Sequence, residues 1–407
     1  MDLPAGLYLL FATAALPPLL DALGRLRRAE AFRPRPASGR RPERVLALIP
    51  ARAEGERMLP LCRDVAREAA AAGTRVETLV ILDGADPAAE AALAGESIPF
   101  LVKSPAGPSK GKALAFATDT LQARTPDPAS EAEFVMVFDS DMRLEAGFFS
   151  RLAVPEGTEA FQLPVRPSGI PASAPARVEA LSLALATRVE DLARDAEGLP
   201  VRLRGKAMGF SPRAWREGPA ASSRTTAEDS EATLRLLARG IVIRALPCPF
   251  AFDEPAGDAG TLARPRARWF AGHLNLLMTG AGDLAKIAAR DPRAAFVLAA
   301  DLWLRPRALV LVSLSIVALA SDVALVVFAL RGETASLVPP LLASVLSKAA
   351  LVLEVRAATT ARAALGTPSE VPPVSARDLA EFAVVWLRAV ARAFLSPGRW
   401  HRARTDA

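Results

Sequence analysis

Residues that often carry metal, redox or disulfide chemistry are scarce in this chain. It contains two cysteines, Cys62 and Cys248, which lie far apart and outside any CxxC pattern. This spacing implies neither a disulfide framework nor a cysteine-bound zinc ion, so a reducing compartment is the default expectation. The two histidines, His273 and His401, are too few to favour a histidine-based triad or metal cluster. We expect Cys62 to pack in the core beneath a helix and His273 to be a packed or interfacial residue.

Aromatic residues are also few, at 6% of the 407 residues, although 51% of the chain is hydrophobic. The length allows one full domain and further segments. The formal net charge of +6 suits nucleic acid, an anionic membrane surface or a phosphorylated substrate as a partner. Because long apolar runs lie near both ends of the chain, we expect a membrane partner and no nucleic acid.

Residues 5–23 are nearly all apolar, with Asp21 as the one charged residue. The stretch is long enough to span a bilayer. A cleaved signal peptide is the alternative interpretation. No basic residue precedes the stretch, however, and Arg25, Arg27 and Arg28 follow it. The positive-inside rule therefore favours an uncleaved anchor that places the following residues in the cytoplasm.

The stretch from residue 44 onward alternates short apolar runs with helical patterns. Strands are predicted at 45–50, 76–82, 100–102 and 134–138, and helices at 57–72, 87–94 and 112–121. This alternation predicts an α/β fold with a mostly parallel sheet covered by helices. The pattern is less regular further on, where we expect strands near 162–164 and 241–246, helices at 176–196 and 227–239, and a strand or loop at 202–210.

The C-terminal part is again membrane-like. Residues 308–330 and 337–355 predict two spans, of which the first contains Asp322 and the second Lys348 and Glu354. Charges inside a span are costly and face protein or water. We expect Lys348 and Glu354 to snorkel from the end of their span and Asp322 to face another helix. Residues 376–394 are amphipathic and basic, which is typical of a helix lying along the membrane interface.

These patterns divide the chain into six segments. We predict a transmembrane helix at 1–24, a basic Pro/Arg-rich linker at 25–43, an α/β domain at 44–272, interfacial helices at 273–307, two transmembrane helices at 308–356 and a basic amphipathic cytoplasmic tail at 357–407. The ending Arg399-Trp400-His401-Arg402 is interpreted as a surface attachment.

The apolar run 134–138 ends in Asp139-Ser140-Asp141. A short, continuously apolar run is typical of a strand buried on both faces, and ligands in open α/β sheets bind beyond the carboxyl ends of strands. If the backbone stays extended, both carboxylates point to the same side. Such a pair suits a hard divalent cation that also holds a phosphate-bearing substrate. The alternative is a strand end followed by an acidic turn.

Further polar motifs follow the other predicted elements in a regular order. They are Pro50-Ala51-Arg52-Ala53-Glu54 and Asp83-Gly84 at strand ends, Ser109-Lys110-Gly111-Lys112 at the start of a helix, Glu228-Asp229 before an amphipathic helix, and Arg266-Ala267-Arg268-Trp269 beyond it. A helix N-terminus favours anions.

In this order and spacing the chain resembles the family 2 glycosyltransferases, over residues 44–272 and more loosely through the flanking spans. The resemblance is greatest to membrane-anchored members such as the cellulose synthase and N-acetylglucosaminyltransferase-like group. It implies a GT-A fold and a hexosyltransferase that moves a sugar, with inversion, from a nucleotide-sugar donor (UDP-linked) to a lipid-linked or polysaccharide acceptor. It also implies a multi-pass protein of the inner membrane with a cytoplasmic catalytic domain.

The resemblance assigns the donor site to particular residues. Those matching nucleotide-sugar-binding positions are Pro50, Arg52, Glu54, Asp83, Lys110, Lys112 and Asp139. The resemblance implies that Asp83 recognises the base, and that Asp139 and Asp141 bind the Mg²⁺ or Mn²⁺ ion that also binds the diphosphate. The alternative for Lys110 and Lys112 is a solvated helix start.

Other positions match the catalytic and acceptor side. Asp229 matches the general base that takes a proton from the acceptor hydroxyl. The alternative is a carboxylate that stabilises the first turn of a helix. Glu228 is the neighbouring candidate, assigned with Gly205 and Gly209 to the acceptor site, where glycine permits close approach of sugar to backbone. Lys206 departs from the small or amide residue that is common at its position, which leaves the type of acceptor open.

The QxxRW motif of the family aligns with residues 265–269, so Pro265 replaces glutamine. The resemblance implies that Arg268 pairs with the diphosphate and that Trp269 caps the acceptor site. The alternative is an interfacial helix anchored by arginine and tryptophan. Because the glutamine is associated with polymerising members, its loss weakens a claim of processive synthesis.

Two other classes of function compete. Pro265 and Lys206 motivate a catalytically weak partner subunit of a polysaccharide assembly complex, although the retained acids argue against it. A sugar-nucleotide pyrophosphorylase needs a Gly-rich motif near the first strand, which residues 49–53 lack. Two spans after the catalytic domain are few for an export channel. If the product is a polymer, we therefore expect a separate translocation partner or a homo-oligomer.

Overall fold

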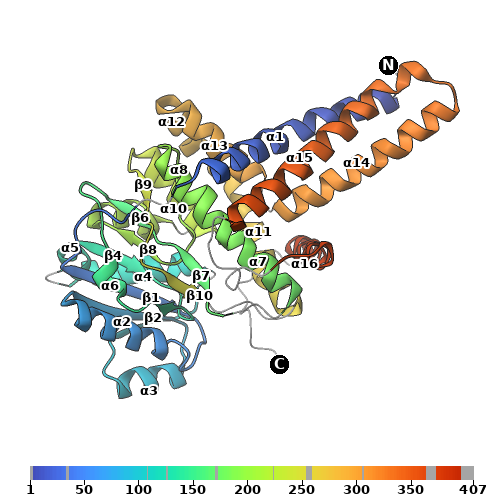
Figure 1. Ribbon diagram of the computed structural model, residues 1–407. Coiled ribbons are helices and arrows are strands. Elements are labelled where there is room, and N and C mark those ends of the chain that lie inside the picture. Colours follow the sequence, from blue (N-terminus) through green and yellow to red (C-terminus); the bar gives the residue numbers. More distant parts are fainter. Residues whose placement is uncertain are drawn as a thin grey trace.

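The computed structural model describes residues 3–33, 36–107, 109–124, 127–169, 173–222, 224–253, 259–304, 307–363 and 373–395. An α/β domain lies at one end of the molecule, and a group of long helices extends away from it (Figure 1). The basic ending at residues 399–402, predicted to be a surface attachment, lies outside the described residues.

The centre of the domain is a seven-stranded sheet. Its strands, in spatial order, are β3 (Phe100–Lys103), β2 (Arg75–Asp83), β1 (Arg44–Ala51), β4 (Phe134–Val137), β8 (Met208–Phe210), β6 (Ala160–Gln162) and β9 (Ile243–Ala245). Strands β1 to β4 are mutually parallel, β6 is parallel to β9, and β8 is antiparallel to both of its neighbours. The expectation of a mostly parallel sheet is confirmed.

Both faces of β1 are buried, as the apolar runs predicted. Val45 and Ile49 belong to the core on one face, and Leu46 and Leu48 belong to the core on the other. Alternate residues of a strand point to opposite faces, so a strand covered on both sides must be apolar throughout.

Helices cover the two faces of the sheet. One core contains side chains of α2 (Leu59–Ala72), α3 (Pro87–Gly95) and α6 (Phe148–Arg151). The other contains side chains of α4 (Lys110–Gln122), α5 (Pro128–Glu131), α9 (Pro212–Glu217) and α10 (Glu228–Ala238). Cys62 is buried in α2, as predicted.

A second, three-stranded sheet joins β5 (Arg143–Leu144), β10 (Ala251–Asp253) and β7 (Val165–Pro167). Neither β5 nor β10 was predicted. The single strand expected at 162–164 is in fact the junction between β6 and β7, which lie in different sheets. Strands of two or three residues carry too little periodicity to be recognised.

The helix predicted at 176–196 is interrupted. It consists of α7 (Ala174–Leu185), a π-helical segment η1 (Ala186–Leu192) and α8 (Ala193–Ala196). A π-helical turn inserts one residue without changing the apolar spacing enough to be visible in the sequence.

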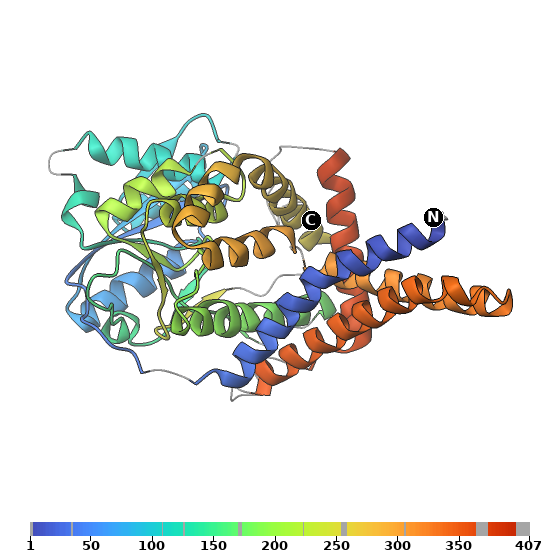
Figure 2. The same ribbon diagram turned by 90° about the horizontal axis from the view of Figure 1, so that it is seen from above.

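Among the described residues, three helices are long and apolar enough to cross a membrane. They are α1 (Leu3–Ala31), α14 (Arg307–Leu330) and α15 (Val338–Ala363), and their candidate spans are Gly6–Ala31, Leu309–Leu330 and Thr334–Ala361. α15 packs against both α1 and α14, and the three project together from the domain (Figures 1 and 2).

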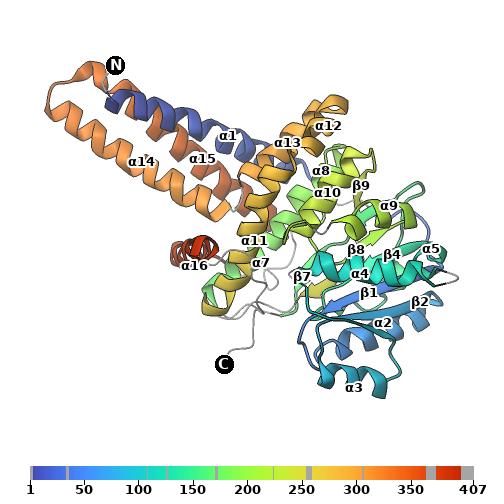
Figure 3. The same cartoon turned by 180° about the vertical axis from the view of Figure 1, so that it is seen from behind.

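The described residues contain four further helices after the α/β domain: α11 (Ala259–Thr279), α12 (Ala281–Arg290), α13 (Pro292–Trp303) and α16 (Ala376–Leu395), of which α12 packs against α10 and α13. α16 packs against α11 and α7 (Figure 3). The buried Arg266 of α11 lies 3.0 Å from Glu179 of α7 and places its guanidinium over the rings of Phe382 and Trp386. His273 is buried in α11, with its Nε2 atom 2.6 Å from the carbonyl oxygen of Leu302.

Asp322, Lys348 and Glu354, which lie inside the two C-terminal candidate spans, are each paired. Asp322 lies 2.8 Å from Lys348 and accepts a hydrogen bond from the Ser344 hydroxyl on the neighbouring helix. Glu354 lies 2.7 Å from Arg25 and 3.2 Å from Arg307. The expectation for Asp322 is therefore confirmed. Lys348 and Glu354 are each paired with a residue on another helix, and their snorkelling stays a prediction.

A network of ion pairs joins the three long helices to the domain. We call it the junction network; its members are Asp21, Arg25, Glu190, Asp191, Arg194, Arg204, Asp301, Arg307 and Glu354. Arg307 is its centre, at 2.5 Å from Asp21 on α1, 3.2 Å from Glu190 on η1 and 3.2 Å from Glu354 on α15.

Replacing Arg307 by glutamine should destabilise the folded protein by about 3–5 kcal/mol, because three carboxylates then lose their shared cation in a mostly buried place. Thermal or denaturant unfolding of the full chain in detergent measures this. The matched control is Arg377→Gln, which removes an arginine from the exposed pair with Glu381 and should leave the unfolding midpoint unchanged. Equal effects of the two substitutions would contradict the importance of the junction network.

Candidate active site

The predicted site residues gather at one edge of the central sheet. Because β1, β2 and β4 are parallel, their carboxyl ends lie side by side. Arg52 and Glu54 follow β1, Asp83 is the last residue of β2, and Asp139 and Asp141 follow β4. Pro50 is the exception, since it is buried inside β1, in register with Ile81 of β2. Its assignment to the nucleotide-sugar site stays a prediction.

Asp83 is buried at the end of β2. Its carboxylate accepts a hydrogen bond of 2.7 Å from the Gly107 amide and lies 3.4 Å from both Arg52 and Lys103. Arg52 also donates to the Gly107 carbonyl. Asp83 thus holds the loop after β3 and orients Arg52 across the end of β2.

The two lysines at the start of α4 have different surroundings. Ser109 caps the helix by accepting a hydrogen bond from the Lys112 amide. The Lys110 ammonium donates to the carboxylate of Asp139 and, at 2.5 Å, to the carbonyl of Gly205. Lys112 is exposed. Lys110 is therefore the lysine placed among the acids, and a solvated helix start describes Lys112 better.

The Asp139-Ser140-Asp141 motif does not continue the extended strand. β4 ends at Val137, and the chain turns so that the Met142 amide donates to the Asp139 carbonyl at 3.2 Å. The period-two argument for the two carboxylates is therefore wrong. Asp139 is half-buried and Asp141 is exposed. The charge of Lys206 acts on both carboxylates, and the charge of Asp253 also acts on Asp141.

The electrostatics of the two acids differ. Burial alone would raise the pKa of Asp139, but the charges of Lys110 and Lys206 outweigh it and hold the pKa below its ordinary value. Although solvent reaches Asp141, the surrounding protein raises its pKa to about 7, and the negative charges of Asp253 and Asp139 add to this effect. Like-charged carboxylates crowded in this way favour protonation or a bound cation.

The donor set fits a hard divalent cation such as Mg²⁺ or Mn²⁺. Both ions prefer carboxylate oxygens and retain sites for water and phosphate oxygens. Among the described residues, no three acids, histidines or cysteines are close enough to enclose a metal by themselves. Asp139 and Asp141 therefore suit an ion that takes its remaining ligands from a diphosphate and water.

The residues between Arg202 and Ala207, here called the 202–207 segment, bring a glycine and a lysine to the same edge. Gly205 adopts a positive φ of 80° against the side chain of Asp229. Lys206 forms an ion pair with Asp253 at the end of β10. Asp253 escaped the sequence analysis because β10 was not predicted, although an apolar run ending in an acid was the available signal.

Gly209 has a packing role. A Cβ atom at this position would lie 2.0 Å from the ring of Phe161 on β6, so the pairing of β8 with β6 requires glycine. The assignment of Gly209 to the acceptor site stays a prediction.

The first turn of α10 carries Glu228 and Asp229, and carboxylates there interact favourably with the helix dipole. Burial raises the pKa of Glu228 to about 7, and the charge of Asp229 contributes, against the opposing charges of Lys110 and Arg268. Asp229 accepts a hydrogen bond of 2.7 Å from the Ser230 amide and faces Gly205.

Helix α11 is attached to the turn before α10. The Thr225 hydroxyl donates to the Gly272 carbonyl at 2.8 Å, and the Thr226 hydroxyl donates to the Arg268 carbonyl at 3.0 Å. This places Arg268 where the charges of Glu228 and Asp139 act on it, while burial lowers its pKa. Trp269 is exposed on the same helix, so capping of an acceptor and anchoring at an interface both stay open.

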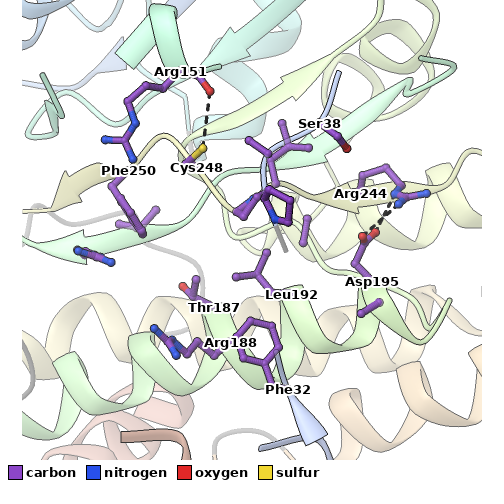
Figure 4. Close-up of a pocket in the computed structure, with 18 of the residues that line it drawn as sticks. Phe32, Ser38, Arg151, Thr187, Arg188, Leu192, Asp195, Arg244, Cys248 and Phe250 are labelled. Carbon is purple, nitrogen blue, oxygen red and sulfur yellow. Dashed lines mark hydrogen bonds and ion pairs between the residues drawn. The ribbon is translucent and has the colours of Figure 1, made fainter. Parts of the chain in front are cut away.

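A separate cavity of about 370 Å³ lies between η1, β7 and the chain that follows α1 (Figure 4). Arg188 and Thr187 of η1, Phe32 and the loop residue Phe250 contribute to its lining. None of the predicted site residues lines it. This cavity is therefore distinct from the edge where the acids gather.

Comparison with known proteins identifies the fold. No protein-family model matches the chain, and no curated protein matches it in sequence. A mannosyltransferase from Pyrobaculum calidifontis, solved with GDP-Man and Mn²⁺, superposes with a TM-score of 0.54 at 16% identity, covering 97% of this chain and 100% of that one. The chain therefore has a GT-A-type fold, and the likeness extends through its long helices.

Other similar structures match only part of the chain. A glucosyl-3-phosphoglycerate synthase from Mycobacterium tuberculosis, solved with Mn²⁺ and uridine diphosphate, has a TM-score of 0.36 at 16% identity and covers 57% of this chain and 79% of that one. A mannosyl-3-phosphoglycerate synthase from Rubrobacter xylanophilus has a TM-score of 0.34 at 12% identity, covering 61% and 74%.

Gly111→Ala should disturb the site through packing. A Cβ atom at Gly111 would lie 2.2 Å from the backbone oxygen of Ser222, so α4 and the chain before α10 must separate. We expect a loss of about 1–3 kcal/mol in the free energy of unfolding. Gly95→Ala is the matched control, because the added methyl group on α3 meets nothing within 4 Å and should be neutral or slightly stabilising. Denaturant unfolding of both variants decides, and equal midpoints would contradict the close approach.

Proposed function

We propose that this protein is a metal-assisted, inverting glycosyltransferase that moves a sugar from a nucleotide-sugar donor to a lipid-linked or polysaccharide acceptor at a membrane. The observation that carries the proposal is the convergence of Asp83, Lys110, Asp139, Asp229 and Arg268 around one edge of a GT-A-type sheet. This edge thus combines carboxylates for a metal ion, basic side chains for a diphosphate and a carboxylate for proton transfer.

On the donor side, Glu54, Asp83 and Arg52 are proposed to bind the nucleoside. Lys110 and Arg268 would hold the diphosphate, because both cations lie where the charge of Asp139 acts on them. A Mg²⁺ or Mn²⁺ ion held by Asp139 and Asp141 would stabilise the negative charge that develops on the leaving nucleoside diphosphate. Lys112, exposed at the next turn, would attract the donor without contacting the transferred sugar.

On the acceptor side, Asp229 is proposed to take the proton of the acceptor hydroxyl. The hydroxyl oxygen forms a bond to the anomeric carbon while the bond from that carbon to the diphosphate oxygen breaks, so the configuration inverts in one displacement. Glu228 stays protonated more readily than an ordinary glutamate, since its pKa is raised to about 7, and it would donate a hydrogen bond to the acceptor. Gly205 leaves room beside Asp229.

The three long helices support a membrane-bound enzyme. Arg25, Arg27 and Arg28 near the domain-side end of α1 favour a cytoplasmic domain and an inner-membrane location. An exposed Trp269 on α11, beside the amphipathic α16, favours an acceptor that reaches the site from the membrane surface. We propose a UDP-linked donor and family 2 membership on the motif resemblance.

A catalytically weak partner subunit is the second candidate. It is favoured by the ion pair between Lys110 and Asp139, since this lysine neutralises an acid that a metal would otherwise use, and by the second ion pair at this edge, between Lys206 and Asp253. Binding of Mn²⁺ and nucleotide without turnover would support this candidate.

The direct test is a screen of the full chain, in membranes and after purification, against labelled UDP- and GDP-sugars with Mn²⁺. We expect transfer or hydrolysis of at least one donor, its loss on chelation of the metal, and its loss in Asp141→Ala. Extraction of the product as lipid or polymer identifies the acceptor class. No reaction with any donor, together with equal nucleotide binding by Asp141→Ala and the unchanged protein, would contradict the proposal.

Asp229→Asn should lower kcat by about 10²–10⁴-fold, because the amide cannot accept the proton of the acceptor hydroxyl. Binding of the nucleoside diphosphate with Mn²⁺, measured by calorimetry, should be unchanged. Glu228→Gln is the matched variant on the preceding residue and should reduce kcat much less. The opposite order of the two effects would move the general base to Glu228.

A further inference from the structure

The 202–207 segment contributes Gly205 and Lys206 to the candidate site, yet it belongs to no helix or strand. β8 begins only at Met208. A chain without regular backbone pairing is held by its side chains and by the side chains of its neighbours. The position of the Gly205 carbonyl, which accepts from Lys110, therefore depends on contacts outside the segment.

Two groups of contacts hold the backbone of the 202–207 segment. On α10, the Thr233 hydroxyl accepts from the Leu203 amide at 3.0 Å. On β6, the buried Gln162 accepts from the Arg204 amide at 2.8 Å and donates to the Lys206 carbonyl at 2.9 Å. These bonds fix the segment against the domain core.

The third group of contacts is made by the side chain of Arg204, which points away from the core. Its guanidinium forms two bonds of 2.7 Å to the two carboxylate oxygens of Asp191, lies 3.3 Å from Glu190 and donates to the Ala186 carbonyl at 3.2 Å. All three partners belong to η1. Glu190 and Asp191 are both buried, so removing the bidentate guanidinium would leave their charges without a partner at a large cost in free energy.

η1 is in turn joined to the membrane helices. Glu190 lies 3.2 Å from Arg307 at the start of α14 and 3.6 Å from Arg25 on α1. Glu190 thus contacts Arg204, next to the site, and also residues on two helices of the membrane bundle. π-helical turns often occur at functional positions, and here the turn places Glu190 and Asp191 together on Arg204.

We propose that Arg204 is a positioning residue that ties the 202–207 segment, through η1, to the junction between the domain and the membrane helices. It keeps the Gly205 carbonyl beside Lys110 and keeps Lys206 beside Asp253. Its effect on turnover rests on the proposed glycosyltransferase function, whereas its effect on the order of the segment does not.

The junction network contains its own control. Arg194 and Asp301 form a second bidentate pair, at 2.5 and 3.0 Å, with both side chains buried. This pair has the same chemistry as Arg204 and Asp191 but does not touch the 202–207 segment. Removing either pair destabilises the protein, and only removal of the Arg204 pair should release the segment.

The test is hydrogen–deuterium exchange of the full chain in detergent, comparing Arg204→Met and Asp191→Asn with Arg194→Met and Asp301→Asn. In the first two variants we expect exchange at the amides of residues 203 and 204, which donate to Thr233 and Gln162, to rise by about tenfold or more, because loss of the charge-assisted bonds between Arg204 and Asp191 lets the segment open more often. In the second two, exchange there should match the unchanged protein. Arg204→Lys keeps the charge without the bidentate geometry and should give an intermediate result, including where Arg204→Met fails to fold.

Turnover provides the second readout. With a donor identified, Arg204→Met should lower kcat by about tenfold or more, Arg204→Lys should restore part of it, and Arg194→Met should leave it unchanged despite a lower unfolding temperature. Equal exchange at residues 203 and 204 in both sets of variants overturns the proposal. If the unchanged protein transfers no sugar, the proposed function fails, and the exchange experiment still decides the role of Arg204.

Discussion

Arg307 carries a positive charge to the place where the three long apolar helices meet the α/β domain. Asp21, Glu190 and Glu354 approach it from three different elements. Each of these carboxylates is costly to bury alone, so the elements that carry them must stay together. The same constraint reaches Arg204 through Glu190, and from there the 202–207 segment at the candidate site. The placement of the three long helices and the geometry of the candidate site thus depend on one network of ion pairs.

The site itself balances charges of opposite sign. Lys110 and Lys206 each pair with an acid, while Asp141 is crowded by other carboxylates and has a pKa near 7. A divalent cation and a diphosphate together would add both kinds of charge to such a site with little change in the total. The lysines and acids that pair with one another in the structure would therefore also suit a metal together with a phosphorylated ligand.

Much of the fold follows from local patterns in the sequence, and part of the site does not. β4, β1 after Arg44 and the second half of β2 are apolar because both faces are covered, so the strand ends with Asp83 and Asp139 were predictable. The π-helical η1, the short β10 and the pairing of Lys206 with Asp253 depend on residues distant in the chain. Their positions are set by tertiary contacts, which periodicity does not record.

The central claim is that a metal and a nucleoside diphosphate bind where the carboxyl ends of the parallel strands meet. A structure of the full chain with Mn²⁺ and a nucleoside diphosphate tests it most directly, because anomalous scattering locates manganese independently of the protein. The account predicts a manganese peak at Asp139 and Asp141, with the diphosphate between that peak and Arg268. A nucleotide bound instead in the cavity beside η1, or no manganese at the two acids, would contradict it.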